Sequence, residues 1–309
     1  MRIIVACAFS LLPGLCVAMS TPLAMAGASG LSEYGIEGMG VVSTPAAEGH
    51  ASVSADGRRI VWGTIDREGG AGGMDLWQAT LRDGRWQDPA PLALNTDANE
   101  FDPMLSPDGR WLYFYSNRDG GFGGDDLYRA EVMADGGFGP AENLGDGVNS
   151  AGDEWAPMPG PHAGQLLFAS DGHGGGGRHD LFVASWRDGR FADPLPLPGA
   201  VNTAADEFDA AWIGDGAALV FARSREANAA PVRVFVSRCE GDGYTVGEPL
   251  SLSFNTAEAV TFAPAPDWHK PGELLVSGVA RAPRAGKLDI YRTVTPRTEG
   301  DGGCLDPAR

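Results

Sequence analysis

The feature of this sequence that most constrains its fold is an internal repeat of just over fifty residues. An apolar run occurs five times, and the last residues of successive runs are 52, 54, 53 and 55 positions apart. These runs are Ile60–Trp62, Leu112–Phe114, Leu166–Phe168, Leu219–Phe221 and Leu274–Val276. A period of this length is typical of architectures that place one small structural unit beside another several times.

Two further landmarks keep the same register through all five copies. A second apolar run occurs at Asp75–Trp77, Asp126–Tyr128, Asp180–Phe182, Arg233–Phe235 and Asp289–Tyr291. An Asn-Thr or Asn-Ser pair begins at Asn95, Asn149, Asn202 and Asn255, with Ser43–Thr44 in its place in the first copy. Three landmarks in one register indicate five equivalent units, which we assign to one domain over residues 27–296.

Each copy predicts four short antiparallel strands. Asp-Gly pairs, which suit tight hairpins, separate the third and fourth strands at Asp83, Asp135, Asp188 and Asp242. The chain has 45 Gly, 22 Pro and no long window with apolar residues at helical spacing, which favours an all-β fold. Four-stranded sheets arranged radially cover one another's faces. We therefore predict a five-bladed β-propeller.

The ends of the chain decide how such a ring closes. The fifth copy lacks an Asp-Gly turn, and Tyr34 precedes Ser43 by the same interval that separates Trp86 from Asn95. We therefore expect residues 34–42 to supply the missing outer strand of the last blade. A tail over residues 297–309 that forms its own outer strand, with a sixth blade, remains an alternative. Cys239 and Cys304 are candidates for a disulfide that pins this tail to the fourth blade.

The N-terminus has the pattern of a secretory signal peptide. Arg2 precedes an uncharged apolar stretch over residues 3–19, and Ala24 and Ala26 provide a cleavage pattern. We predict a signal peptide over residues 1–26, a periplasmic or secreted monomer, and no stable membrane anchor after cleavage. The formal net charge of −18 makes nucleic acid a poor partner.

The second copy carries the clearest form of the repeat. Residues 99–114 read NEFDPMLSPDGRWLYF, and Ser116–Gly121 and Asp126–Tyr128 continue the pattern. This copy resembles the WD-like repeat of TolB-type β-propellers; the first and third copies match well, and the fourth and fifth are degenerate. The resemblance covers roughly residues 34–295 and implies the propeller fold. It implies little about function, because one fold carries many functions.

Candidate site residues follow from the innermost strand of each copy. Four copies place a glutamate at the same position, namely Glu48, Glu100, Glu154 and Glu207, and the fifth is expected to place Val260 there. Two residues further on, where side chains share a face, the five copies place His50, Asp102, Ala156, Asp209 and Phe262. The glutamates have two interpretations, architectural bonding between blades or an acidic ring at one mouth of the channel.

These residues suggest a binding module of the bacterial cell envelope that holds a protein, peptide or glycan at the channel face. The further candidate anchors for such a partner are Arg118, Trp155, Arg223, Arg225 and Trp268. The alternative is a glycoside hydrolase whose acid and base are channel carboxylates such as Asp102 and Asp209. We favour the non-enzymatic interpretation, because no other catalytic motif is found.

Neither a cofactor nor a metal site is predicted. His173 and His179, with Asp171 or Asp180, contain the atoms that zinc or copper would need. They flank a run of glycines, however, and imidazoles in such a loop are more often simply solvated.

Overall fold

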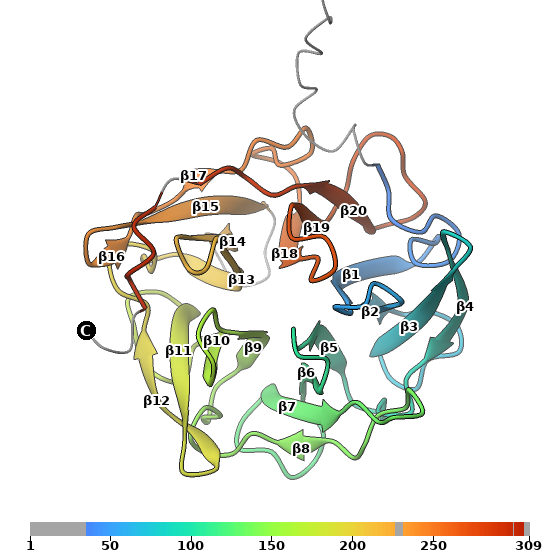
Figure 1. The fold of residues 1–309 in the computed structure, drawn as a ribbon, viewed down its shortest axis with the longest axis horizontal. Helices are drawn as coiled ribbons and strands as arrows, with labels where there is room; N and C mark the ends of the chain where they lie inside the picture. Colours follow the sequence, from blue (N-terminus) through green and yellow to red (C-terminus); the bar gives the residue numbers. More distant parts are fainter. Residues whose placement is uncertain (1–34, 226–230, 299, 306–309) are drawn as a thin grey trace, which may run out of the picture.

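The computed structural model describes residues 35–225, 231–298 and 300–305. These residues form five antiparallel sheets arranged as blades around a central channel (Figure 1). The fold is all-β, and the predicted five-bladed propeller is confirmed. Among the described residues, no helix is long and apolar enough to span a bilayer.

The strands follow the sequence repeat from the channel outward. The first blade contains β1 (Ala47–Val53), β2 (Arg59–Ile65), β3 (Met74–Arg82) and β4 (Arg85–Pro91). The second contains β5 (Glu100–Leu105), β6 (Trp111–Ser116), β7 (Asp126–Glu131) and β8 (Glu142–Asn143). The third contains β9 (Glu154–Pro159), β10 (Gln165–Ser170), β11 (Asp180–Arg187) and β12 (Arg190–Pro196).

The last two blades depart slightly from this plan. The fourth contains β13 (Asp206–Ile213), β14 (Ala218–Ser224) and β15 (Val232–Glu240), and its outer strand is split into β16 (Gly243–Tyr244) and β17 (Glu248–Pro249). The fifth contains β18 (Thr261–Pro266), β19 (Glu273–Gly278) and β20 (Asp289–Val294). Its sheet therefore lacks a full outer strand of its own.

The Asn landmark ties each blade to the one before it. Asn95 accepts a hydrogen bond from the Leu76 N–H at 2.9 Å and donates one to the Leu76 carbonyl at 3.0 Å. Asn149, Asn202 and Asn255 make the same pair of bonds to Leu127, Leu181 and Val234. The asparagine side chain therefore makes the two hydrogen bonds that the backbone of a neighbouring strand would make. This fixed pairing explains why the landmark keeps its register.

The N-terminal segment closes the ring, as the sequence predicts. Ile36 pairs antiparallel with Tyr291 of β20, and the Glu37 N–H donates to the Ile290 carbonyl at 2.8 Å. The Ser43 hydroxyl bonds both backbone groups of Ile290, as the Asn landmark does elsewhere. The paired part is shorter than expected, because Gly38 and Gly40 adopt positive φ and turn the chain away. Tyr34 lies outside the described residues, as does the signal peptide predicted over residues 1–26.

The C-terminal segment lies against the fourth blade and does not start a sixth. A disulfide joins Cys239 of β15 to Cys304, with their Cα atoms 5.8 Å apart. The Asp301 N–H donates to the Cys239 carbonyl at 3.0 Å, and the Gln165 side chain reaches the Leu305 carbonyl at 3.0 Å. The tail is therefore held by the fourth blade and touches the third.

Candidate functional site

The innermost strand of every blade carries a β-bulge at the same repeat position. The residues at that position adopt left-handed φ values between 48° and 52°, and they are His50, Asp102, Ala156, Asp209 and Ala263. A bulge re-aims a side chain. Here Asp102 and Asp209 line a hollow at one mouth of the channel.

The expected assignment of the fifth copy is wrong by one residue. Thr261 pairs with Gly278 as Glu100 pairs with Ser116, so Thr261 takes the glutamate position in place of Val260. Ala263, and not Phe262, then occupies the bulge. The cause is one extra residue between the Asn landmark and β18, since Thr261 follows Asn255 by six residues where Glu100 follows Asn95 by five.

Three bulge side chains meet inside the channel. His50 Nδ1 lies 2.8 Å from Asp102 Oδ1 and 4.0 Å from Asp209 Oδ1. The second oxygen of each carboxylate accepts a backbone N–H from the next blade, from Ala156 for Asp102 and from Ala263 for Asp209, both at 3.0 Å. Each carboxylate is thus fixed through Oδ2 and presents Oδ1 towards the imidazole.

Burial and charge change how these groups ionise. Burial, together with the charge of Asp102, raises the pKa of Asp209 to about 7. Burial alone would lower the pKa of His50, but the charge and hydrogen bond of Asp102 and the charge of Asp209 outweigh it and raise this pKa. Asp209 therefore loses its proton close to neutral pH, and His50 keeps its proton to a higher pH than an ordinary histidine.

Asp102 and Asp209 also line a pocket of about 380 Å³ whose walls are formed by aromatic side chains and carboxylates. Its lining residues are Ile65, Met74, Asn99, Phe101, Asp102, Tyr115, Asn117, Asp125, Trp155, Phe208, Asp209 and Phe262. None of these twelve residues is Lys or Arg. We call this hollow the channel-mouth pocket.

Asp125 is a pocket residue that the sequence did not single out. Its Oδ2 accepts a hydrogen bond from Trp155 Nε1 at 2.8 Å, and burial raises its pKa to about 6. It directly precedes the strand-start Asp of β7. Met74 and His179 occupy the same place in the first and third copies, so a departure from the repeat at this place was the available signal.

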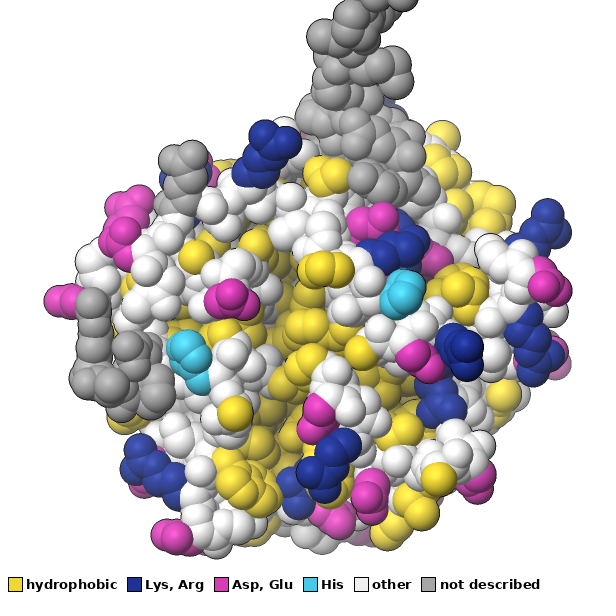
Figure 2. Space-filling view, in the orientation of Figure 1, with side chains coloured by type: hydrophobic (Ala, Val, Ile, Leu, Met, Phe, Trp, Pro, Cys, Tyr) yellow, Lys and Arg dark blue, Asp and Glu magenta, His cyan; other side chains and the backbone are white. Residues whose placement is uncertain are grey.

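The opposite mouth of the channel is built differently. Trp268 Nε1 of the fifth blade donates to the Leu105 carbonyl of the second blade at 2.7 Å, so this side chain reaches across the channel. Hairpins between the first and second strands of each blade surround this mouth. Figure 2 shows hydrophobic side chains around the hollow at its centre, with most charged side chains farther out.

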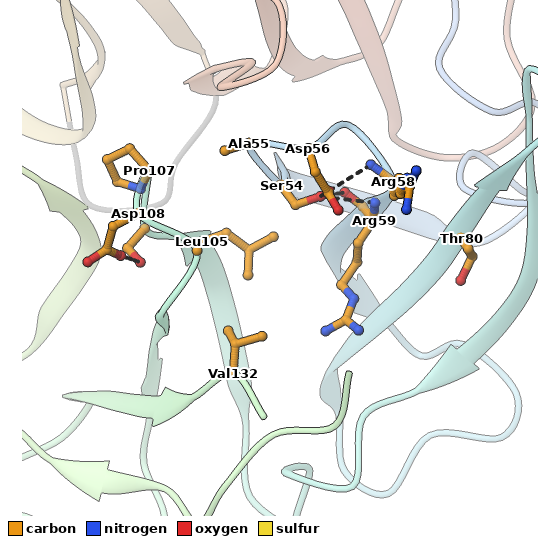
Figure 3. A pocket seen from close by; sticks show the side chains of 12 residues that line it. Ser54, Ala55, Asp56, Arg58, Arg59, Thr80, Leu105, Pro107, Asp108 and Val132 are labelled. Atoms are coloured by element: carbon orange, nitrogen blue, oxygen red, sulfur yellow. Dashed lines mark hydrogen bonds between the residues drawn. The ribbon is translucent and has the colours of Figure 1, made fainter. Parts of the chain in front are cut away.

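A further cavity of about 400 Å³ lies between the first two blades, among the same hairpins (Figure 3). Leu105, Val132 and Arg59 border it. Its polar groups are used locally, because Asp56 accepts bonds from the Ser54 hydroxyl and the Arg58 N–H within one hairpin. Asp108 does the same in the next hairpin, with the Ser106 hydroxyl and the Arg110 N–H, so both carboxylates of this cavity are already engaged and it is not our candidate site.

The four repeated glutamates do not line the channel-mouth pocket. Glu48, Glu100, Glu154 and Glu207 are fully buried. Each accepts bonds from the backbone N–H and the hydroxyl of the Thr or Ser in its own landmark turn, for example Thr96 N–H to Glu100 at 2.8 Å. Their geometry matches the architectural interpretation and not the acidic ring.

The arginine candidates also lie away from the pocket. Arg118 donates to Glu100 at 3.0 Å and lies over the rings of Phe114 and Tyr128, so it completes the glutamate's bonding. Arg225 borders a separate hollow with Arg223 and Arg233. Among the candidates, the structure therefore gathers His50, Asp102, Asp209 and Trp155 in one place.

The fold and this pocket define a five-bladed β-propeller with an acidic, aromatic-walled hollow at one channel mouth. No family model matches the sequence, and no curated protein does. A putative TolB from Agrobacterium tumefaciens superposes with a TM-score of 0.50 at 14% identity, covering 82% of this chain and 92% of that one. An endo-arabinase from Bacteroides thetaiotaomicron gives 0.53 at 13% identity, covering 86% and 99%.

Hydrazine synthase from Kuenenia stuttgartiensis gives a TM-score of 0.51 at 15% identity, over 82% of this chain but only 38% of that one. At these identities the likeness establishes the fold alone. These solved structures include proteins with unrelated activities, as expected for a fold that hosts many functions. The site itself must therefore carry the functional argument.

Proposed function

We propose that this chain is an exported binding module of the bacterial cell envelope that holds a basic group of a protein or peptide in the channel-mouth pocket. The observation that carries the proposal is the pocket's composition, three carboxylates among five aromatic rings with no Lys or Arg in its lining. Aromatic faces and carboxylates together attract an ammonium or guanidinium group.

Electrostatics favour a basic group over a neutral sugar. Asp209 holds a proton up to about pH 7 because its charged form is buried beside Asp102. A cation bound beside these carboxylates, on their pocket side, would stabilise their ionised forms, whereas the hydroxyl groups of a sugar would stabilise them far less. A glycan remains a possible outcome of the test below.

The direct test is calorimetry with acetylated, amidated tripeptides that carry lysine or arginine at the centre, with glutamine as the neutral control. We expect binding of the basic peptides alone, and a rise in affinity between pH 6 and pH 8 as Asp209 loses its proton. Asp209→Asn and Asp125→Asn should each weaken binding about tenfold, which equals about 1.4 kcal/mol.

The control variant is Asp119→Asn, which removes the same charge from an exposed position in the second blade. It should leave the affinity unchanged. Equal binding of the glutamine peptide, or equal losses in all three variants, would exclude the pocket as a site for basic groups. Binding of a neutral oligosaccharide with the same variant pattern would assign the pocket to a glycan.

Glycoside hydrolysis is the second candidate, because Asp209 keeps a proton near neutral pH beside a second carboxylate. One oxygen of Asp102 and one of Asp209 lie within 4.8 Å of each other. This spacing is nearer to the roughly 5–5.5 Å between the carboxyl groups of retaining enzymes than to the roughly 6.5–9.5 Å of inverting ones. Turnover of any member of an aryl glycoside panel that Asp102→Asn abolishes would favour the enzyme.

A further inference from the structure

The third blade gathers three metal-ligating side chains at the rim of the channel-mouth pocket. Asp153 directly precedes β9, Asp171 directly follows β10, and His179 directly precedes β11. A ring nitrogen of His179 and one carboxylate oxygen from each aspartate lie within 4.8 Å of one another. His173, the other histidine of this loop, instead bonds the Val148 carbonyl at 2.7 Å.

His179 has a buried nitrogen without a partner. The residue is 2% exposed, and its Nδ1 lies 2.8 Å from Asp206 Oδ1, which also accepts the His179 backbone N–H at 3.0 Å. Within the described part of the chain, Nε2 is buried and makes no hydrogen bond. A carboxylate on Nδ1 holds the proton there and leaves Nε2 with a lone pair, as in carboxylate–histidine–metal arrangements.

The two aspartates are each held through a single oxygen. Asp171 Oδ1 accepts the Asp153 N–H at 2.8 Å, and Asp153 Oδ1 accepts the Asp125 N–H at 2.9 Å. Among the described residues, Oδ2 of neither aspartate takes part in a hydrogen bond. Asp171 is exposed and Asp153 half-buried, so an ion can enter from solvent.

The repeat does not require these ligands. The same three places are Ala47, Ile65 and Met74 in the first blade, and Val260, Val279 and Leu288 in the fifth. In the second blade they are Asn99, Asn117 and Asp125, and Asn117 accepts the Asn99 N–H at 2.9 Å, as Asp171 does from Asp153. Asparagine therefore suffices for the architecture, and the extra charges of the third blade need another explanation.

We propose that Asp153, Asp171 and His179 bind a divalent transition-metal cation, with zinc as the reference ion. Two carboxylates balance its charge, and one imidazole with two carboxylate oxygens is a donor set that suits zinc. With zinc bonds of about 2.0–2.1 Å, tetrahedral ligand atoms are about 3.4 Å apart, so small side-chain rotations would close the site. Three protein ligands leave one coordination position open.

The site is coupled to the pocket through Trp155. The His179 and Trp155 rings stack with centroids 3.8 Å apart, and Trp155 lines the channel-mouth pocket. An ion on His179 would lie at the pocket rim, with its open position available to water or to a ligand. The metal site does not depend on the proposed function, because none of its three ligands lines the channel-mouth pocket.

The test is calorimetric titration of the tag-free, chelator-treated mature protein with zinc chloride. We expect one zinc ion per chain, and quenching of Trp155 fluorescence by Co²⁺, identified by its loss in Trp155→Phe. The variant carrying Asp153→Asn and Asp171→Asn should lose about a hundredfold or more in zinc affinity. Without metal it should unfold at the same temperature as the parent, because Asn99 and Asn117 do the same structural work in the second blade.

The matched control carries Asp97→Asn and Asp119→Asn, two exposed positions outside the site. Its zinc affinity should equal that of the parent. The proposal is overturned if zinc does not bind, if the double variant and the control bind it equally, or if His173→Gln abolishes binding while His179→Gln does not. Failure of the peptide titration would leave this result unchanged.

Discussion

At the scale of single residues, Asp209 is a buried carboxyl group with Asp102, Asp206 and His50 as its ionisable neighbours. Its pKa of about 7 in the fold lies above the ordinary value of 3.8. The folded state therefore binds a proton that the unfolded state has already released between those pH values. The resulting stabilisation is fully present at low pH and is lost as the pH rises through 7.

We predict that the melting temperature falls between pH 5 and pH 8, by an amount on the order of 5 °C. Glu48, whose pKa burial raises to about 7, and His50, whose pKa is also raised, act in the same direction. Asp209→Asn should therefore make the fall smaller without removing it, and its side-chain oxygen can still accept the Ala263 N–H. Calorimetric melting at several pH values checks this, with Asp119→Asn as control; a parent profile that rises over this range would contradict it.

At the scale of the strand and turn, the four repeated glutamates bond the turn that precedes each innermost strand. Glu100 accepts bonds from Thr96 N–H, the Thr96 hydroxyl at 2.7 Å, the Ser116 hydroxyl at 2.9 Å and Arg118. Removing the Glu100 side chain would leave several buried hydrogen-bond donors without their acceptor, and one of these donors, Arg118, is charged. Such losses are large, because each buried group keeps its desolvation cost.

We therefore expect Glu100→Ala to lower the free energy of unfolding by about 3 kcal/mol. Affinity for the basic tripeptide, measured where the variant is still folded, should change less than twofold. Urea denaturation and calorimetry provide the two measurements. A stable variant that fails to bind the peptide would instead restore the acidic-ring interpretation of these glutamates.

The period of the repeat was sufficient to predict the strands, their order and the closing segment. Each landmark recurs because it makes the same hydrogen bonds in each blade, as Asn95 does with Leu76 and Ser43 does with Ile290. The glycine loops add a requirement between blades, since a Cβ on Gly72 would lie 2.0 Å from the Ala98 carbonyl oxygen of the next blade. The site was harder to predict. Asp125, Asp153 and His179 come together only across loops whose separation depends on blade packing, and sequence spacing does not report that distance.

At the scale of the whole molecule, the first and last chain segments share one blade. Arg292 of β20 forms ion pairs with Glu37 at 2.6 Å and with Glu273 at 2.7 Å. The ion pair with Glu37 lies beside the backbone pairing of Ile36 with Tyr291. Without the N-terminal segment, β20 would be an open sheet edge. Open edges promote association between chains.

A chain that begins at Thr44 should therefore melt at a lower temperature and form dimers or larger species. A chain that begins at Gly35 is the control, since it keeps Ile36, Glu37 and Ser43. Light scattering after size-exclusion chromatography and calorimetry check both effects. Identical melting and a monomeric state for the two chains would show that closure does not depend on this segment.

The central claim is that the channel-mouth pocket holds a basic group. A crystal structure with the lysine tripeptide bound tests it most directly. We predict density for the ammonium group within hydrogen-bond distance of Asp102, Asp209 or Asp125, with its alkyl chain against Trp155. A peptide bound between the hairpins of Figure 3, or a pocket that stays free of peptide at saturating concentration, would contradict the account.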